Sequence, residues 1–201
     1  MTHQEDNAFR REYGLSDWHF AFGLPTTCAE FTNGRAVGEF CLLDDPFRNF
    51  AEYSARILAP FEGMLGPFER SGLRIARYPT ARSFARLLRG TFPTVLFTHC
   101  NPRGLLEFRD GMVAFGDLVS QVPEDFSGIV DFSACEAHNI LPLFKARAPN
   151  CIVKVLDVKL SYIGWLGFYV FFFQEFLAGP VYFADALLRA LTAARAAYTS
   201  S

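Results

Sequence analysis

The stretches TVLFTH (residues 94–99) and IVDFSAC (residues 129–135) decide the fold, because each is an apolar run that ends on a reactive side chain. Both runs are β-branched and apolar and follow turn residues, a pattern that predicts short buried strands. If the strands are parallel neighbours, they lie about 4.8 Å apart, and their carboxyl ends place His99 beside Cys135. An imidazole beside a thiol is the minimum for a cysteine nucleophile, and open α/β sheets hold their sites at that edge.

Length and composition narrow the class of protein. A chain of 201 residues with 51% hydrophobic residues predicts one domain with a sizeable core. Charged residues make up 20% and the net charge is −2, so no basic surface argues for nucleic-acid binding. The 23 Phe residues are an unusual number, and we expect them to fill the core and to cover a surface that a partner buries.

The cysteines and the apolar segments indicate the compartment. The five cysteines are odd in number and irregular in spacing, and residues 1–13 are polar, without an apolar signal-peptide core. Both features favour a reducing cytoplasm with free thiols. The stretch Tyr162 to Leu177 has 16 residues and includes Gln174 and Glu175. A membrane-spanning helix needs about 20 apolar residues, so we expect a buried helix packed on a sheet and no membrane span.

The order of elements predicts an α/β fold. Residues 1–35 are expected to form an irregular N-terminal extension, with a peripheral strand starting at Trp18, and residues 36–201 to form the domain. Strands are expected at residues 36–43, 73–78, 94–99, 129–135 and 151–156, with helices between them and two more at the end. A hairpin is expected around Asp110-Gly111. This alternation implies a mostly parallel sheet with helices on both faces.

Several of these segments together resemble a known family. The stretch THCNPRGLLEFRDGMVAFGDLVSQVPEDFSGIVDFSACEA (residues 98–137) resembles the core of the caspase-like cysteine peptidases, most closely the CHAT branch related to caspases and separases. That core has a strand ending in His, a hairpin, a short helix, and a strand ending in Ser-Ala-Cys plus an acidic residue. The tail FYVFFFQEFLAGPVYFADALLRALTAAR (residues 168–195) is similar to the last two helices of the family.

The resemblance implies a three-layer caspase-like domain with a catalytic dyad. Cys135 would be the nucleophile and His99 its acid–base partner. Backbone N–H groups of Cys135 and of Cys100, the residue after the histidine, would hold the oxyanion. The family usually has Gly where this chain has Cys100, and this departure implies that the oxyanion hole needs a partner or a rearrangement to form.

The substrate pocket is expected at the ends of the first and last core strands, at Asp44, Asp45 and Asp157. Acidic side chains there would favour Arg or Lys before the cleaved bond. Asp45 is equally explained as the cap of a helix that begins at Pro46.

The function that the resemblance implies is a cysteine endopeptidase without a cofactor. It would act on protein substrates in the cytoplasm of a bacterium, as an effector of stress or antiphage defence gated by a regulatory or sensor chain. Two alternatives remain open. The chain could be a catalytically degenerate docking subunit, or His99, Cys100, Cys135 and His138 could form a zinc site, although adjacent His-Cys ligands are strained.

Overall fold

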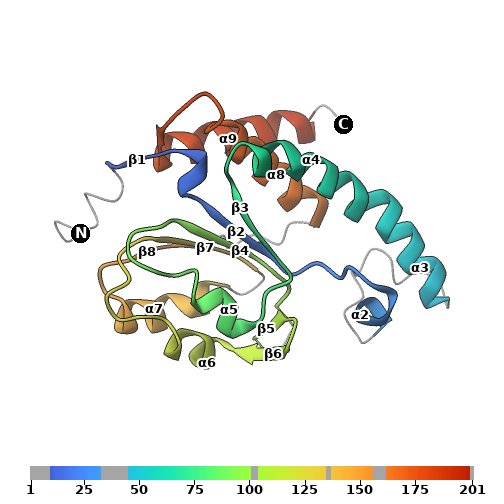
Figure 1. Ribbon diagram of the computed structural model, residues 1–201, viewed down its shortest axis with the longest axis horizontal. Helices are drawn as coiled ribbons and strands as arrows, with labels where there is room; N and C mark the ends of the chain where they lie inside the picture. Colours follow the sequence, from blue (N-terminus) through green and yellow to red (C-terminus); the bar gives the residue numbers. More distant parts are fainter. Residues whose placement is uncertain (1–9, 33–44, 101–103, 135–136, 156–161, 200–201) are drawn as a thin grey trace. The chain divides into compact units, whose positions relative to one another are not determined.

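The computed structural model describes residues 10–32, 45–100, 104–134, 137–155 and 162–199. The chain divides into two compact units, Met1–Gly23 with Phe68–Ser201, and Leu24–Pro67. At the centre of the first unit is a five-stranded parallel sheet in the order β3-β2-β4-β7-β8 (Figure 1). Its strands are β2 (His19–Phe22), β3 (Arg74–Arg77), β4 (Thr94–Phe97), β7 (Ile129–Ser133) and β8 (Ile152–Val155).

The order of the strands locates one special point on the sheet. The first strand along the chain, β2, lies between the second, β3, and the third, β4. The connections therefore run in opposite directions on either side of the gap between β2 and β4. In open α/β sheets, ligands bind outside the carboxyl ends of the strands at such a switch point. Here those ends are at Phe22 and Phe97.

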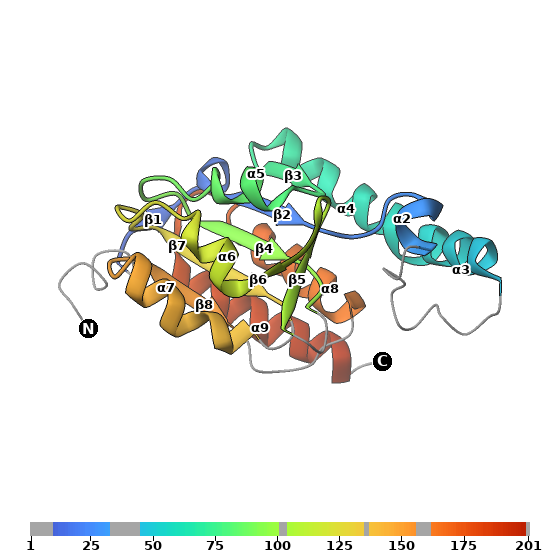
Figure 2. The same ribbon diagram turned by 90° about the horizontal axis from the view of Figure 1, so that it is seen from below.

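Helices cover both faces of this sheet. One face carries α5 (Ala81–Ala85), α6 (Phe115–Ser120) and α7 (Leu141–Arg147), and Figure 2 gives the view from the side of these helices. The other face carries α8 (Tyr162–Gln174) and α9 (Phe183–Thr199). The expected α/β class with a parallel sheet is confirmed. The smaller elements of this unit are β1 (Glu12–Tyr13), η1 (Leu15–Asp17), the hairpin β5 (Leu105–Phe108) and β6 (Gly111–Ala114), η4 (Ala137–Ile140) and β9 (Val181–Tyr182).

The two faces are packed with different side chains. The α5–α7 face is an apolar cluster of mixed aliphatic and aromatic residues, among them Phe84, Leu96 and Phe132. On the α8 face the rings dominate, and Trp18 contacts Phe172 edge to face with ring centroids 5.0 Å apart. Most of the described phenylalanines are buried in these two layers, and the exposed aromatic side chains of the described ranges are Phe47, Phe92 and Tyr182.

The expectation for the first 35 residues is wrong where they are described. Residues 12–32 contain β1, η1, β2 and the helix α2 (Cys28–Thr32), and β2 lies inside the sheet rather than at its periphery. The apolar part of β2, Phe20-Ala21-Phe22, is buried on both sides. It is only three residues long, and so short an apolar run does not identify a central strand in the sequence. The strand expected at residues 36–43 lies outside the described residues.

The other predicted elements are largely confirmed. Thr80 caps α5 by accepting a hydrogen bond from the N–H of Ser83, and Gly72, with φ of 109°, precedes β3. The second unit contains α2, α3 (Pro46–Tyr53), the π-helical turn η3 (Ser54–Leu58) and the start of α4 (Ala59–Arg70). The π-helical turn η3 ends two residues before Pro60, which has no N–H to continue the α-helical hydrogen bonds.

The apolar segment at residues 162–177 forms the buried helix α8, as predicted, and it packs on the sheet. In the described part of the chain, every helix is too short or too polar to cross a membrane.

Candidate functional site

The two strands that carry the predicted dyad are parallel neighbours. Thr94 pairs with Val130 and Phe97 with Ser133, an offset of 36 residues along the whole of β4. The N–H of Thr98 donates to the carbonyl oxygen of Ser133 at 3.2 Å, which extends the ladder one residue beyond β4. The prediction that these strands lie side by side is confirmed, and their offset equals the separation of His99 and Cys135 in the sequence.

His99 lies two residues beyond the end of β4, at the switch point of the sheet. Its side chain is half-buried, and this burial lowers the pKa of the imidazole below 6.5. The carbonyl oxygen of His99 accepts a hydrogen bond from the N–H of Glu107 in β5 at 2.9 Å. A histidine with a lowered pKa is neutral at pH 7, and a neutral imidazole can accept a proton from a nearby acid.

Cys100 is fixed by the hairpin next to it. Its backbone forms an antiparallel bridge with Leu106, and its residue is 4% exposed. Its side chain belongs to the apolar cluster of the α5–α7 face, a setting that does not favour a metal ligand. Among the described residues, the positive φ angles outside glycine are confined to Tyr78, so the backbone at Cys100 does not have the left-handed conformation.

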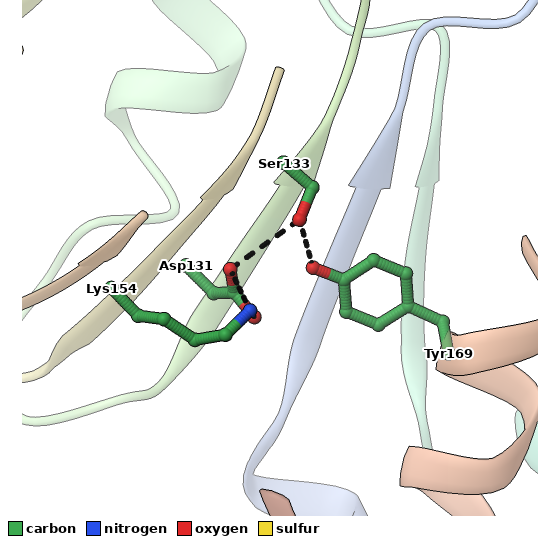
Figure 3. Close-up of polar contacts among 4 residues, drawn as sticks. All are labelled: Asp131, Ser133, Lys154 and Tyr169. Atoms are coloured by element: carbon green, nitrogen blue, oxygen red, sulfur yellow. Dashed lines mark hydrogen bonds and ion pairs between the residues drawn. The ribbon is translucent and has the colours of Figure 1, made fainter. Parts of the chain in front are cut away.

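A buried polar network lies on the α8 face, beneath the end of β7 (Figure 3). The Lys154 ammonium group contacts both carboxylate oxygens of Asp131 at 2.7 Å, and the two side chains are 8% and 1% exposed. Ser133 donates to Asp131 at 3.4 Å and shares a short hydrogen bond with the Tyr169 hydroxyl. The network therefore joins β7, β8 and α8 at the position from which residue 135 follows.

Aromatic rings surround the cation of this network. The Lys154 ammonium lies over Phe168 at 5.3 Å from the ring centroid and over Trp165 and Tyr169 at 5.9 Å. Ring faces attract cations, and the attraction is stronger where water is excluded. Burial, together with the Asp131 carboxylate, raises the pKa of Tyr169 well above 10, so this hydroxyl keeps its proton.

The remaining predicted residues fall in different places. Cys135, Asp44 and Asp157 lie outside the described residues. Asp45 caps α3 in the second unit, where its carboxylate accepts hydrogen bonds from the N–H groups of Phe47 and Arg48 at 3.0 and 3.2 Å. His138 lies in η4. Within the described ranges, no group of three His, Cys, Asp or Glu side chains is placed to hold a metal ion.

The buried network was not predicted, although the sequence carries a signal for it. Asp131 and Lys154 each interrupt an otherwise apolar strand. A charge inside a buried strand needs a partner, because an unpaired buried ion is strongly unfavourable. Because the two strands were expected to share a sheet, an ion pair between Asp131 and Lys154 could have been predicted from the sequence.

Comparison with known proteins gives no family, since no protein-family model, no curated protein and no solved structure matches the chain.

Proposed function

We propose that the protein is a cysteine endopeptidase of the caspase-like, CHAT type, with Cys135 as nucleophile and His99 as acid–base partner. The observation that carries the proposal is the pairing of β4 with β7 at an offset of 36 residues. Phe97 and Ser133 both contact Tyr169 on the α8 face. His99 and Cys135 each follow two residues later in the sequence, and we expect their side chains to lie on the same side of the sheet. The proposed site thus lies at the carboxyl ends of neighbouring strands, beside the switch point.

The neutral imidazole suits the first step of this reaction. His99 takes the proton of the Cys135 thiol, and the thiolate sulfur attacks the peptide carbonyl carbon. The carbon–nitrogen bond of the tetrahedral intermediate then breaks as the imidazolium protonates the leaving amine. Water, deprotonated by His99, attacks the resulting thioester. The products are a carboxylic acid and the free thiol, and no oxidant or cofactor is required.

The order of elements supports the same proposal. The strand β4 with His99, the hairpin β5–β6, the helix α6 and the strand β7 follow one another as in the family that the sequence resembles. The turn of the hairpin at Asp110-Gly111 has a φ of 127° at Gly111, a value that glycine adopts at little cost. Fold alone does not establish an activity, so the proposal depends on the dyad and is tested there.

The test is labelling of the full chain with a thiol-reactive peptidyl probe, followed by mapping of the labelled cysteine. We expect labelling at Cys135, abolished by Cys135→Ala and strongly reduced by His99→Ala. The matched control is Cys28→Ala, which removes a half-buried free thiol from the second unit and should leave labelling unchanged. Labelling that survives Cys135→Ala would show that the nucleophile is assigned wrongly.

The same proposal includes a preference for Arg or Lys before the cleaved bond, from Asp44, Asp45 and Asp157. A fluorogenic peptide library cleaved by the chain should be enriched in basic residues at that position. Preference for an acidic or apolar residue would refute the acidic pocket and leave the dyad intact. Asp45→Asn separates the charge of this residue from its role as a cap, because Asn caps a helix about as well as Asp.

A second candidate is a docking subunit with a peptidase-like fold and no turnover. The observation that favours it is Cys100, which has a buried side chain, a backbone bridge to Leu106 and no positive φ. Such a chain would bind a partner and give no probe labelling at Cys135 under any condition.

A further inference from the structure

A pocket outside the proposed site lies on the surface of the α5 and α6 layer. It has a volume of about 420 Å³ and is lined by the side chains of Arg82, Ala85, Arg86, Arg89, Gln121 and Pro123. Small-molecule sites in proteins typically have volumes of about 300–1,000 Å³. None of the lining residues belongs to the dyad, the hairpin or the buried network, so this pocket is independent of the proposed peptidase site.

Three arginines concentrate positive charge in this pocket. Arg82 lies in α5, Arg86 is its C-cap, and Arg89 lies in the turn that follows. All three side chains are exposed, and in the described part of the chain none makes an ion pair or a side-chain hydrogen bond. Three like charges this close repel one another, so an anion bound between them removes an unfavourable interaction.

The surroundings do not neutralise this charge. No acidic residue lines the pocket, and Glu124, the neighbour of Pro123, is paired with Arg147 at 2.6 Å. Other arginines of the chain have carboxylate partners, such as Arg77 with Glu69 and Arg189 with Glu175. Among the described residues, the three arginines of the pocket therefore have no anionic partner.

The chemistry of the donors indicates which anion fits. Guanidinium groups bind phosphate through paired, planar N–H donors and remain charged at any physiological pH. Arg82 lies in the first turn of α5, Arg86 caps its C-terminus, and Arg89 lies three residues beyond the helix end. We expect donors at three such positions to bind a chain of phosphates better than a single phosphate. Pro123 adds a partly exposed apolar side chain to the lining of the pocket, against which part of a small molecule can pack.

We propose that this pocket binds a small molecule that carries two or more linked phosphate groups. The ligand would contact Arg82, Arg86 and Arg89 through its phosphates, with charge-assisted hydrogen bonds from each guanidinium. The proposal does not depend on the peptidase assignment, and either can fail while the other stands.

The test is isothermal titration calorimetry of the full chain with inorganic pyrophosphate at low salt. We expect saturable one-to-one binding that weakens as the sodium chloride concentration is raised, because added salt shortens the distance over which charges attract each other. Arg86→Gln and Arg82→Gln should each weaken binding at least about tenfold, the equivalent of one charged hydrogen bond. The matched control, Arg56→Gln, changes an exposed helical arginine of the second unit and should leave binding unchanged.

Three outcomes would overturn the proposal. The first is the absence of saturable binding, and the second is an equal loss of affinity in Arg56→Gln and Arg86→Gln. The third is tighter binding of an oligoglutamate peptide than of pyrophosphate, which would assign the pocket to an acidic protein segment instead. Circular dichroism of each variant establishes that the comparison is made between folded proteins.

Discussion

The two faces of the central sheet differ in the side chains that are buried against them. The α5–α7 face packs an apolar cluster that includes the thiols of Cys100 and Cys151, and the buried Thr98 hydroxyl at the end of β4 donates to the carbonyl oxygen of Glu107. On the α8 face, the Asp131–Lys154 ion pair, with Ser133 and Tyr169, is enclosed by aromatic rings. Apolar packing stabilises a fold at no electrostatic cost, whereas a buried ion pair often contributes little net stability. The charged face is also the one that Phe97 and Ser133 contact, two residues before His99 and Cys135 in the sequence.

This difference suggests a division of roles between the faces. The apolar face holds the sheet together, and the polar network fixes how β7, β8 and α8 meet below the proposed site. Buried polar groups that are fully paired can specify a single arrangement of the elements that they join. Predictions about the two faces can therefore be compared directly, using the same type of substitution on each.

The largest effect is expected from Lys154→Met. The substitution leaves the Asp131 carboxylate buried without its cation, and breaking a buried pair in this way costs about 3–5 kcal/mol. On the other face, Leu96→Met conserves volume in the apolar cluster and should cost less than about 1.5 kcal/mol. Urea unfolding at pH 7 measures both. Equal losses of stability for the two variants would show that the faces do not differ as described.

Cys100 follows His99 and belongs to the apolar cluster. Cys100→Gly tests whether its backbone conformation limits the proposed activity. Gly adopts positive φ freely, while a residue with a side chain does so at a cost of about 1 kcal/mol or more. If the oxyanion donor requires that conformation, the wild type should cleave peptides very slowly. Cys100→Gly should then raise basal cleavage, by up to the roughly 100- to 1000-fold that one oxyanion donor contributes.

The control for this variant is Cys100→Ala, which removes the same sulfur but keeps the Cβ atom. Both variants lose a buried thiol from the apolar cluster, so both should be somewhat less stable than the wild type. Only the glycine variant should gain activity in a fluorogenic peptide assay. A wild type that is already fully active, and unchanged by Cys100→Gly, would refute the gating argument.

The strands and turns of the fold could be predicted from the sequence better than its buried polar contacts. The β4–β7 pairing and the hairpin follow from local patterns, namely apolar runs and the Asp-Gly turn. The internal position of β2 could not be predicted in this way. Three buried residues are too few to show a hydrophobic period, and the place of β2 in the sheet depends on its pairing with β3 and β4. The net charge of −2 gave no indication of the three arginines of the pocket, because it does not show which charged side chains lie close together in the fold.

A smaller effect is expected from Tyr169→Phe on the polar face. Loss of the hydrogen bond to Ser133 should cost about 0.5–1.5 kcal/mol at pH 7. Because burial raises the pKa of Tyr169 well above the value near 10 of the unfolded chain, its contribution is complete below pH 10 and is lost as the pH rises further. Urea unfolding at pH 7 and 10.5 should therefore show a shallower alkaline loss of stability in Tyr169→Phe than in the wild type.

The smallest effect concerns the titration of His99, which lies where the polar face reaches the edge of the sheet. Burial lowers the pKa of its imidazole below 6.5, so its contribution to stability is complete above pH 6.5 and is lost as the pH falls through the folded pKa. NMR of the ring protons should show this lowered value in Cys135→Ala. In the wild type, a Cys135 thiolate within about 4–6 Å would favour the charged imidazole and raise the value. A pKa that is identical in the two proteins would show that no Cys135 thiolate lies close to His99 while the imidazole titrates, whereas a value above 6.5 in Cys135→Ala would contradict the burial argument itself.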